Sequence, residues 1–158
     1  MIAGALLLVI ATAAATYGTV SQYVARPLNR QNLGVIKGPP RTTHSTSFKD
    51  LGGWGLSDGM TIDARAGLAA TLSVTVSGAP VEFRIFTEDV NNGFAIHNLP
   101  PGSAHFDPGT GTQSVSFTWV SGLAAGRYTV NIAWRSPTGA IVTLDRGSLV
   151  VQYGARVP

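Results

Sequence analysis

The first 25 residues of this 158-residue chain, Met1 to Ala25, contain no charged side chain. Twenty-four helical residues extend about 36 Å, enough to cross a bilayer core of about 30 Å. A cleaved signal peptide would begin with a basic region, which is missing here, although Ala13-Ala14-Ala15 has the character of a cleavage site. A small β domain cannot enclose an all-apolar helix as part of its core. We therefore predict a transmembrane or assembly-buried helix over residues 1–25.

Two stripes on this predicted helix favour contact with a second helix. Residues with small side chains or hydroxyl groups recur at helical spacing, and we assign them to helix docking: Ala11, Thr12, Ala15, Thr16, Gly18 and Thr19. Small side chains let two helix backbones approach closely, and hydroxyl groups can form hydrogen bonds across the contact. The alternative is that alanine and threonine are simply tolerated in a single-pass anchor.

The apolar segment ends at Arg26-Pro27, because the residue before a proline is disfavoured in helical geometry. We assign Tyr23, Arg26 and Arg30 to the membrane-flanking region, where tyrosines and basic residues collect. The positive charges lie only after the segment, which by the positive-inside rule places the remaining chain in the cytoplasm. The low charge of that remaining chain is more typical of an extracytoplasmic domain, so the side of the membrane stays open.

Residues 26–58 lack sustained periodicity and contain Pro27, Pro39-Pro40 and a glycine cluster at positions 52–55. Such punctuation predicts an extended connector, with one short strand possible around Thr43 to Phe48. The connector also carries several large apolar residues, which makes it too apolar for a free coil. We expect it to lie along a protein surface, part of which belongs to a neighbour.

From about residue 59 the hydrophobic period becomes two. Alternating runs lie at 71–76, 81–85, 114–119, 127–135 and 149–153, and turn sequences rich in Gly, Pro, Asn and Asp separate them. About seven to nine strands without an intervening helix pattern predict a mainly β fold with an antiparallel β-sandwich over residues 59–158. The large rings of the inward positions form the predicted structural core, namely Phe83, Phe117, Trp119, Tyr128 and Trp134.

The segment Leu123–Val130 (LAAGRYTV) resembles the corner and following strand of immunoglobulin-like and fibronectin type III-like sandwiches. In those folds a leucine, a glycine and a tyrosine precede an alternating strand. The resemblance implies that Tyr128 is the corner tyrosine, whose hydroxyl bonds to backbone a few residues upstream. Because the chain has no cysteine, an antibody-type domain is not implied.

The net charge of +3 is unevenly placed, since residues 1–41 carry Arg26, Arg30, Lys37 and Arg41 and no acid. Basic residues confined to a short strap beside an apolar segment fit phosphate head groups or an acidic protein surface better than nucleic acid. We therefore predict a membrane and other protein subunits as partners, and no nucleic acid.

No motif predicts catalysis, a metal site or a cofactor. His97, His105 and Asp107 come nearest to a ligand set, but the spacing of the two histidines matches no compact metal motif, and His44 stands alone. The sequence 89–93 resembles half a calcium loop, yet the twelfth position is proline, so a turn is expected. The sequence 109–112 has no lysine after it and is expected to be a hairpin connection. Nothing resembles a nucleophile elbow, and the only glutamates are Glu82 and Glu88.

These observations favour a non-enzymatic structural or assembly subunit, anchored by its N-terminal helix in a membrane or helical assembly and contacting other subunits through the β-sandwich. The plan loosely resembles archaeal-type pilins and membrane-linked virion proteins, which implies a surface filament or virion as alternatives to a single-pass membrane location. An accessory subunit of a multi-protein membrane complex is the second hypothesis. A membrane-anchored adhesion or ligand-binding module, with a site among loops 88–106, is the third.

Overall fold

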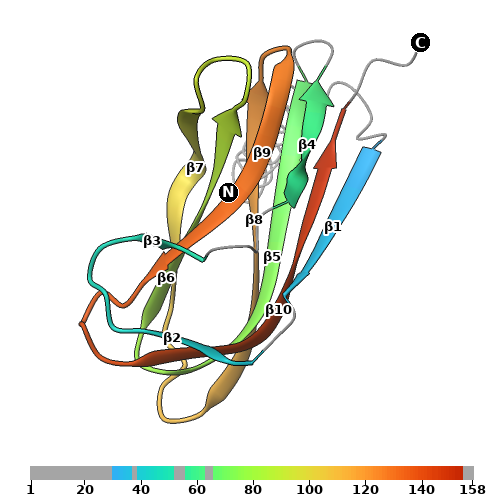
Figure 1. The fold of residues 1–158 in the computed structure, drawn as a ribbon. Helices are drawn as coiled ribbons and strands as arrows, with labels where there is room; N and C mark the ends of the chain where they lie inside the picture. Colours follow the sequence, from blue (N-terminus) through green and yellow to red (C-terminus); the bar gives the residue numbers. More distant parts are fainter. Residues whose placement is uncertain (1–29, 37–38, 52–55, 63–65, 155–158) are drawn as a thin grey trace, which may run out of the picture.

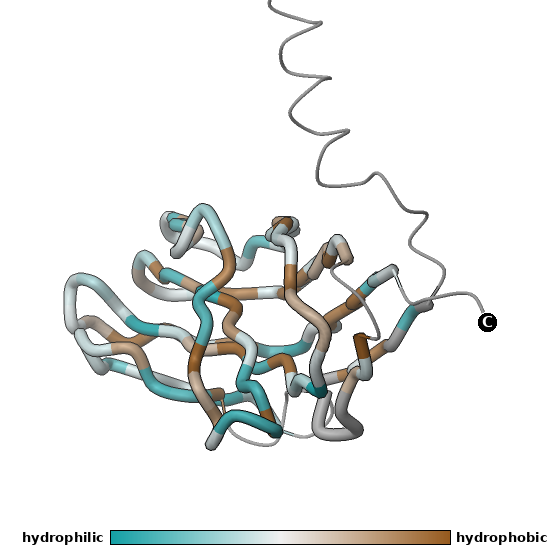
Figure 2. Tube along the Cα trace, turned by 90° about the horizontal axis from the view of Figure 1, so that it is seen from above, coloured by the Kyte–Doolittle hydropathy of each residue, from teal (hydrophilic) through white to brown (hydrophobic). Residues whose placement is uncertain are grey.

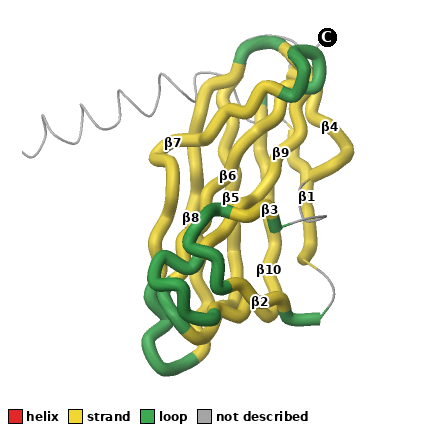
Figure 3. The backbone as a smooth tube through the Cα atoms, turned by 60° about the vertical axis from the view of Figure 1, so that its left-hand side comes forward, coloured by secondary structure: helices red, strands yellow, loops and turns green. Residues whose placement is uncertain are grey.

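A computed structural model of the chain describes residues 30–36, 39–51, 56–62 and 66–154, which form ten β-strands. The strands make two antiparallel sheets packed face to face (Figure 1). Strands and loops account for all of the described residues, and none of these residues is helical (Figure 3). The antiparallel two-sheet sandwich predicted from the period-two pattern is therefore confirmed.

The first sheet, sheet A, has the strand order β1-β10-β5-β8, and β2 pairs with a further part of β10. Its strands are β1 (Arg30–Ile36), β2 (Arg41–Thr43), β5 (Ala66–Gly78), β8 (Thr112–Leu123) and β10 (Val142–Tyr153). The long pair β5–β8 keeps one continuous register from Ala66↔Leu123 to Ser77↔Thr112. Residues that are far apart in the sequence thus lie side by side across four strands.

The second sheet, sheet B, has the order β3-β9-β6-β7, and β4 pairs with a further part of β9. Its strands are β3 (Lys49–Asp50), β4 (Leu56–Ile62), β6 (Val81–Asp89), β7 (Ala95–Phe106) and β9 (Gly126–Arg135). The register between β6 and β7 shifts, because Arg84 pairs with Ser103 whereas Phe86 pairs with Asn98. Leu99–Gly102 therefore form a bulge opposite Ile85.

The core lies between the sheets and follows from the alternation of side chains along each strand. In β5, buried and partly exposed residues alternate over twelve positions. In β6 and β9 the residues that point between the two sheets are likewise buried. Apolar and polar residues accordingly alternate along the trace in Figure 2. Of the five predicted core aromatics, Phe83, Trp119, Tyr128 and Trp134 are buried, while Phe117 is partly buried at the margin of the core. The Phe117 ring packs edge-on against the ring of Trp119, with the two centroids 4.8 Å apart.

The region expected as a connector belongs largely to the sandwich. Residues 30–36, 41–43 and 49–50 are strands of the two sheets, whereas 44–48, where a short strand was expected, is not a strand. The prediction of a connector was wrong for these residues, because β1 and β2 pair with β10 at the edge of sheet A. Pairing at an edge needs no strict alternation of apolar and polar residues in the sequence. Arg30 pairs with Tyr153 as the first residue of β1.

The predicted helix over residues 1–25 lies outside the described residues, and so do Tyr23 and Arg26. Among the residues that are described, no helix has the length and apolar character needed to cross a membrane.

The corner predicted at Tyr128 is present. The Tyr128 hydroxyl donates a hydrogen bond to the carbonyl oxygen of Ala124 over 3.3 Å. A Cβ atom at Gly126 would lie 3.0 Å from the Tyr128 ring, so glycine is the residue that lets the ring fold back over the turn. Burial, and secondarily the negative charge of Asp89, raise the pKa of the Tyr128 phenol above its ordinary value.

Candidate functional site

The outer face of sheet A carries rows of hydroxyl groups. The outward residues of β5 and β8 face each other as three hydrogen-bonded pairs: Thr71 with Thr118 at 2.8 Å, Ser73 with Ser116 at 2.9 Å, and Thr75 with Ser114 at 3.0 Å. This arrangement follows from the unbroken register between two strands whose outward residues are all serine or threonine over 71–77 and over 112–118. We call this surface the hydroxyl face.

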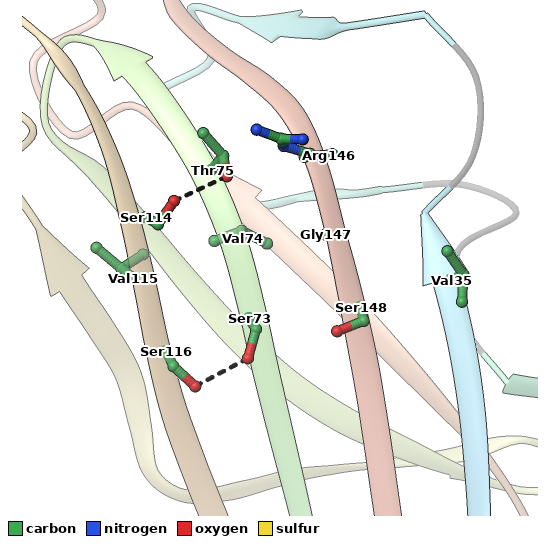
Figure 4. A pocket seen from close by; sticks show the side chains of 10 residues that line it. All are labelled: Val35, Ser73, Val74, Thr75, Ser114, Val115, Ser116, Arg146, Gly147 and Ser148. Atoms are coloured by element: carbon green, nitrogen blue, oxygen red, sulfur yellow. Dashed lines mark hydrogen bonds between the residues drawn. The ribbon is translucent and has the colours of Figure 1, made fainter.

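A shallow hollow of about 470 Å³ lies on the hydroxyl face. It runs across four strands, from Val35 on β1 over Ser148 on β10 to the residues of β5 and β8 (Figure 4). Arg146 is the one charged side chain among the described residues that line it. The Arg146 guanidinium makes no hydrogen bond or ion pair to another described residue.

The hydroxyl pairs lower the free-energy cost of removing this face from water. A buried hydroxyl group is costly when it has no partner, but here the members of each pair already bond to each other. Each pair uses one of its two hydroxyl hydrogens, so contact with another surface leaves one donor of each pair, and not two, to find a new acceptor. The hydroxyl face combines low charge with partly satisfied hydrogen bonds, which suits contact with a protein or a polar ligand.

The outer face of sheet B has the opposite character. The Arg135 guanidinium forms an ion pair with Glu82 at 2.8 Å, and the His105 imidazole lies 3.6 Å from the same carboxylate. Two guanidinium groups lie over the Phe48 ring, with the Cζ atoms of Arg84 and Arg135 at 4.5 and 4.7 Å from its centroid. The Glu82 carboxylate and the Arg135 guanidinium pair with each other, and covering this face would remove several charges from water.

The structure does not bring together the histidine and aspartate residues that were considered as metal ligands. His44, His97 and His105 are exposed, and His105 faces Glu82 across the β6–β7 pair. The described residues contain no group of three or more His, Cys, Asp or Glu side chains placed to hold a metal ion. Asp89 and Asp107 each accept a hydrogen bond from the backbone N–H two residues later, at 3.0 and 2.9 Å. The expected turn at 89–93 is thus confirmed.

Two expectations about residues 95–112 were wrong. The segment 109–112 was expected to be a hairpin connection, but it links β7 of sheet B to β8 of sheet A. Residues 95–106, expected as loops, form strand β7. The bulge at Leu99–Gly102 contains two prolines and interrupts the period of two, which is why the sequence pattern did not reveal this strand.

The six residues assigned to helix docking, Ala11 to Thr19, lie outside the described residues, and that assignment stays a prediction. Sequence reasoning did not identify the hydroxyl face. Its only sequence signal is the Ser/Thr content of alternate positions in β5 and β8, which becomes a surface only when the register between these strands is known.

A comparison with protein-family models finds no match, and a comparison with curated proteins finds none either. Among solved structures, the chain is similar to the CBM22-1 xylan-binding domain from Paenibacillus barcinonensis Xyn10C, with a TM-score of 0.43 and 12% identity over 82% of this chain and 85% of that chain. It is also similar to the Clostridium thermocellum N-terminal endo-1,4-beta-D-xylanase 10B CBM22-1-GH10 modules complexed with xylohexaose, with a TM-score of 0.36 and 10% identity over 81% of this chain and 25% of that chain. These similarities concern the sandwich shape alone and carry no argument about a ligand. They give no support to the resemblance to pilins or virion proteins.

Proposed function

We propose that this chain is a non-enzymatic assembly subunit whose β-sandwich contacts other protein subunits through sheet A. In this proposal the apolar segment 1–25 anchors the subunit in a membrane or a helical assembly. The stripes from Ala11 to Thr19 then pack against neighbouring helices.

The observation that carries the proposal is the difference between the two outer faces. The hydroxyl face presents hydrogen-bonded Ser/Thr pairs and the guanidinium of Arg146, which has no partner among the described residues. The outer face of sheet B carries the ion pair of Glu82 with Arg135 and the two guanidinium groups around Phe48. Since removing charges from water opposes association, sheet A is the side on which a protein contact forms at least cost.

The proposal is tested by photo-crosslinking of the full-length chain in cells that express it. A benzophenone amino acid replaces Ser73 at the centre of the hydroxyl face or, as the matched control, Asn131 on the outer face of sheet B. We expect a protein adduct of defined mass from position 73 and none from position 131. Equal adducts from both positions, or an adduct from position 131 alone, would contradict the proposed contact surface.

A ligand-binding module is the second candidate, and the hollow around Arg146 is the observation that favours it. A hollow lined by hydroxyl groups and by one cation without a partner in the described part of the chain suits a small polar or acidic ligand. The two functions are separated by Arg146→Ala. Loss of a small-molecule ligand with unchanged protein adducts from position 73 would favour ligand binding.

A further inference from the structure

The two edges of sheet A are the feature that carries a further inference. Strand β8 forms one edge and pairs only with β5 among the described residues, while β1 forms the other edge and pairs with β10. An edge strand presents unpaired backbone N–H and C=O groups, which can pair with a strand of another chain.

Proteins usually protect such edges, and sheet B shows how. Its edge strand β7 contains two prolines within a bulge, and the opposite edge is divided between β4 and the short strand β3, whose two residues, Lys49 and Asp50, are both charged. Prolines, bulges and charges all discourage strand addition. Strand β8 has none of these features, because its twelve residues contain no charge and no proline, and its register with β5 does not shift. In β1 the only charged residue is Arg30 at the first position.

The direction of the strands makes the two edges complementary to each other. Each neighbouring pair in the order β1-β10-β5-β8 is antiparallel, so β1 and β8 run in opposite directions. If the β1 edge of one copy is placed beside the β8 edge of the next, the new pair is also antiparallel. The sheet then continues from one copy into the next with the same alternation.

Three of the six large apolar side chains that are exposed among the described residues lie where this contact would cover them. Leu33 and Val35 on β1 are 58% and 54% exposed, and Val120 on β8 is 41% exposed. The pairing register places all three on the outer face of sheet A. Successive partners across the sheet are Leu33, Val150, Thr71 and Thr118, so Leu33 shares the outer face with Thr71, and Val35 and Val120 are each two residues further along the same strands. Pairing Leu33 with Val120 would bring all seven residues of β1 opposite 117–123, within the length of β8, and would cover apolar area from both copies.

We propose that copies of this chain associate head to tail, with β1 of one copy adding to the β8 edge of the next, so that sheet A is continuous across the assembly. This inference rests on the proposed function in taking the chain to be an assembly subunit, but it concerns the edges of sheet A and identifies the partner as a second copy. A heterologous contact of this kind leaves a free β8 and a free β1 at the two ends, so the assembly grows as a ring or a filament. A foreign strand added to β8 would leave the apolar side chains of β1 exposed, which is why a second copy is the better occupant.

The test uses the absence of cysteine from the chain. Leu33→Cys and Val120→Cys are introduced into the full-length protein, singly and together, and the samples are oxidised. Within one copy the two positions are separated by three strand spacings, about 14 Å. A disulfide needs Cα atoms within about 7 Å, so a bond between these positions reports contact between copies.

We expect the double variant to form a ladder of dimers, trimers and larger species on a non-reducing gel. Each single variant alone should stay monomeric, and a mixture of the two single variants should stop at the dimer. Disulfide-linked dimers from Val120→Cys alone would show two-fold pairing of β8 with β8 and would overturn the head-to-tail arrangement.

A second measurement separates failure of this inference from failure of the proposed function. Adducts from position 73 without any bond between positions 33 and 120 would leave the contact through the hydroxyl face standing and would overturn the edge pairing. Edge pairing also predicts that Val120→Lys abolishes the disulfide ladder of a Val35→Cys, Thr118→Cys chain, since these two positions are opposite each other on the outer face in the same register. Asn131→Lys on the other sheet should leave that ladder unchanged. A ladder that survives Val120→Lys would overturn the proposal.

Discussion

The indole N–H of Trp119 donates a hydrogen bond to the carbonyl oxygen of Gly102 over 3.0 Å. Trp119 belongs to β8 of sheet A and is completely buried, while Gly102 ends the bulge of β7 in sheet B. The bond therefore joins the two sheets at the side where the chain passes from one to the other. It also gives a partner to a carbonyl group in the bulge.

Trp119→Phe should lower the free energy of unfolding by about 2 kcal/mol, because the smaller ring leaves a void and the Gly102 carbonyl loses its donor. Chemical denaturation followed by circular dichroism measures the change. Trp134→Phe is the matched control, since Trp134 is also buried but packs on Phe83 with ring centroids 6.3 Å apart and has no indole hydrogen bond to a described residue. If both variants lose the same stability, the bond to Gly102 contributes nothing measurable.

Tyr128→Phe should lower the free energy of unfolding by about 1 kcal/mol, because it removes the hydrogen bond to the Ala124 carbonyl without creating a cavity. The same denaturation experiment measures the change. Tyr153→Phe serves as the control, since Tyr153 is likewise buried and its hydroxyl has no hydrogen bond to a described residue. A loss from Tyr153→Phe that equals the loss from Tyr128→Phe would argue against a stabilising corner.

The raised pKa of Tyr128 predicts a loss of stability at alkaline pH. The unfolded chain releases the phenolic proton near pH 10, whereas the folded protein holds it to higher pH. Above the unfolded pKa the unfolded state binds fewer protons, so the stability contributed by the protonated phenol is complete below about pH 10 and declines as pH rises through the folded pKa. Denaturation midpoints measured between pH 8 and pH 11.5 should fall more steeply for the wild-type chain than for Tyr128→Phe. Parallel curves for the two proteins would show that the Tyr128 phenol has the same pKa in both states.

Strong periodicity made much of the sandwich predictable from the sequence. The alternation around Phe83, Trp119 and Trp134 identified strands and their buried faces correctly, because a side chain must point to one side of the sheet or the other. The Tyr128 corner was also predictable, since its glycine, its tyrosine and its hydrogen bond all lie within a few residues of one another. Features that depend on a few neighbouring residues can be predicted from the sequence of that segment alone.

Strands without alternation were not predictable in the same way. Strand β1 lies in a region that was expected to be a connector, and its place in sheet A depends on pairing with β10 more than one hundred residues later. Strand β7 was obscured by the prolines of its bulge. In both cases the backbone hydrogen bonds of a distant strand override a weak local preference.

The sequence by itself determined the apolar character of residues 1–25, the sandwich with its buried aromatic rings, and the corner at Tyr128, because each depends on spacing within one short segment. Only the tertiary structure decided that Ser73 meets Ser116, that Trp119 reaches Gly102, and that β1 and β8 are opposite edges of one sheet. Those relationships depend on strand order and register, which are set by the packing of the whole chain and by no single segment of it.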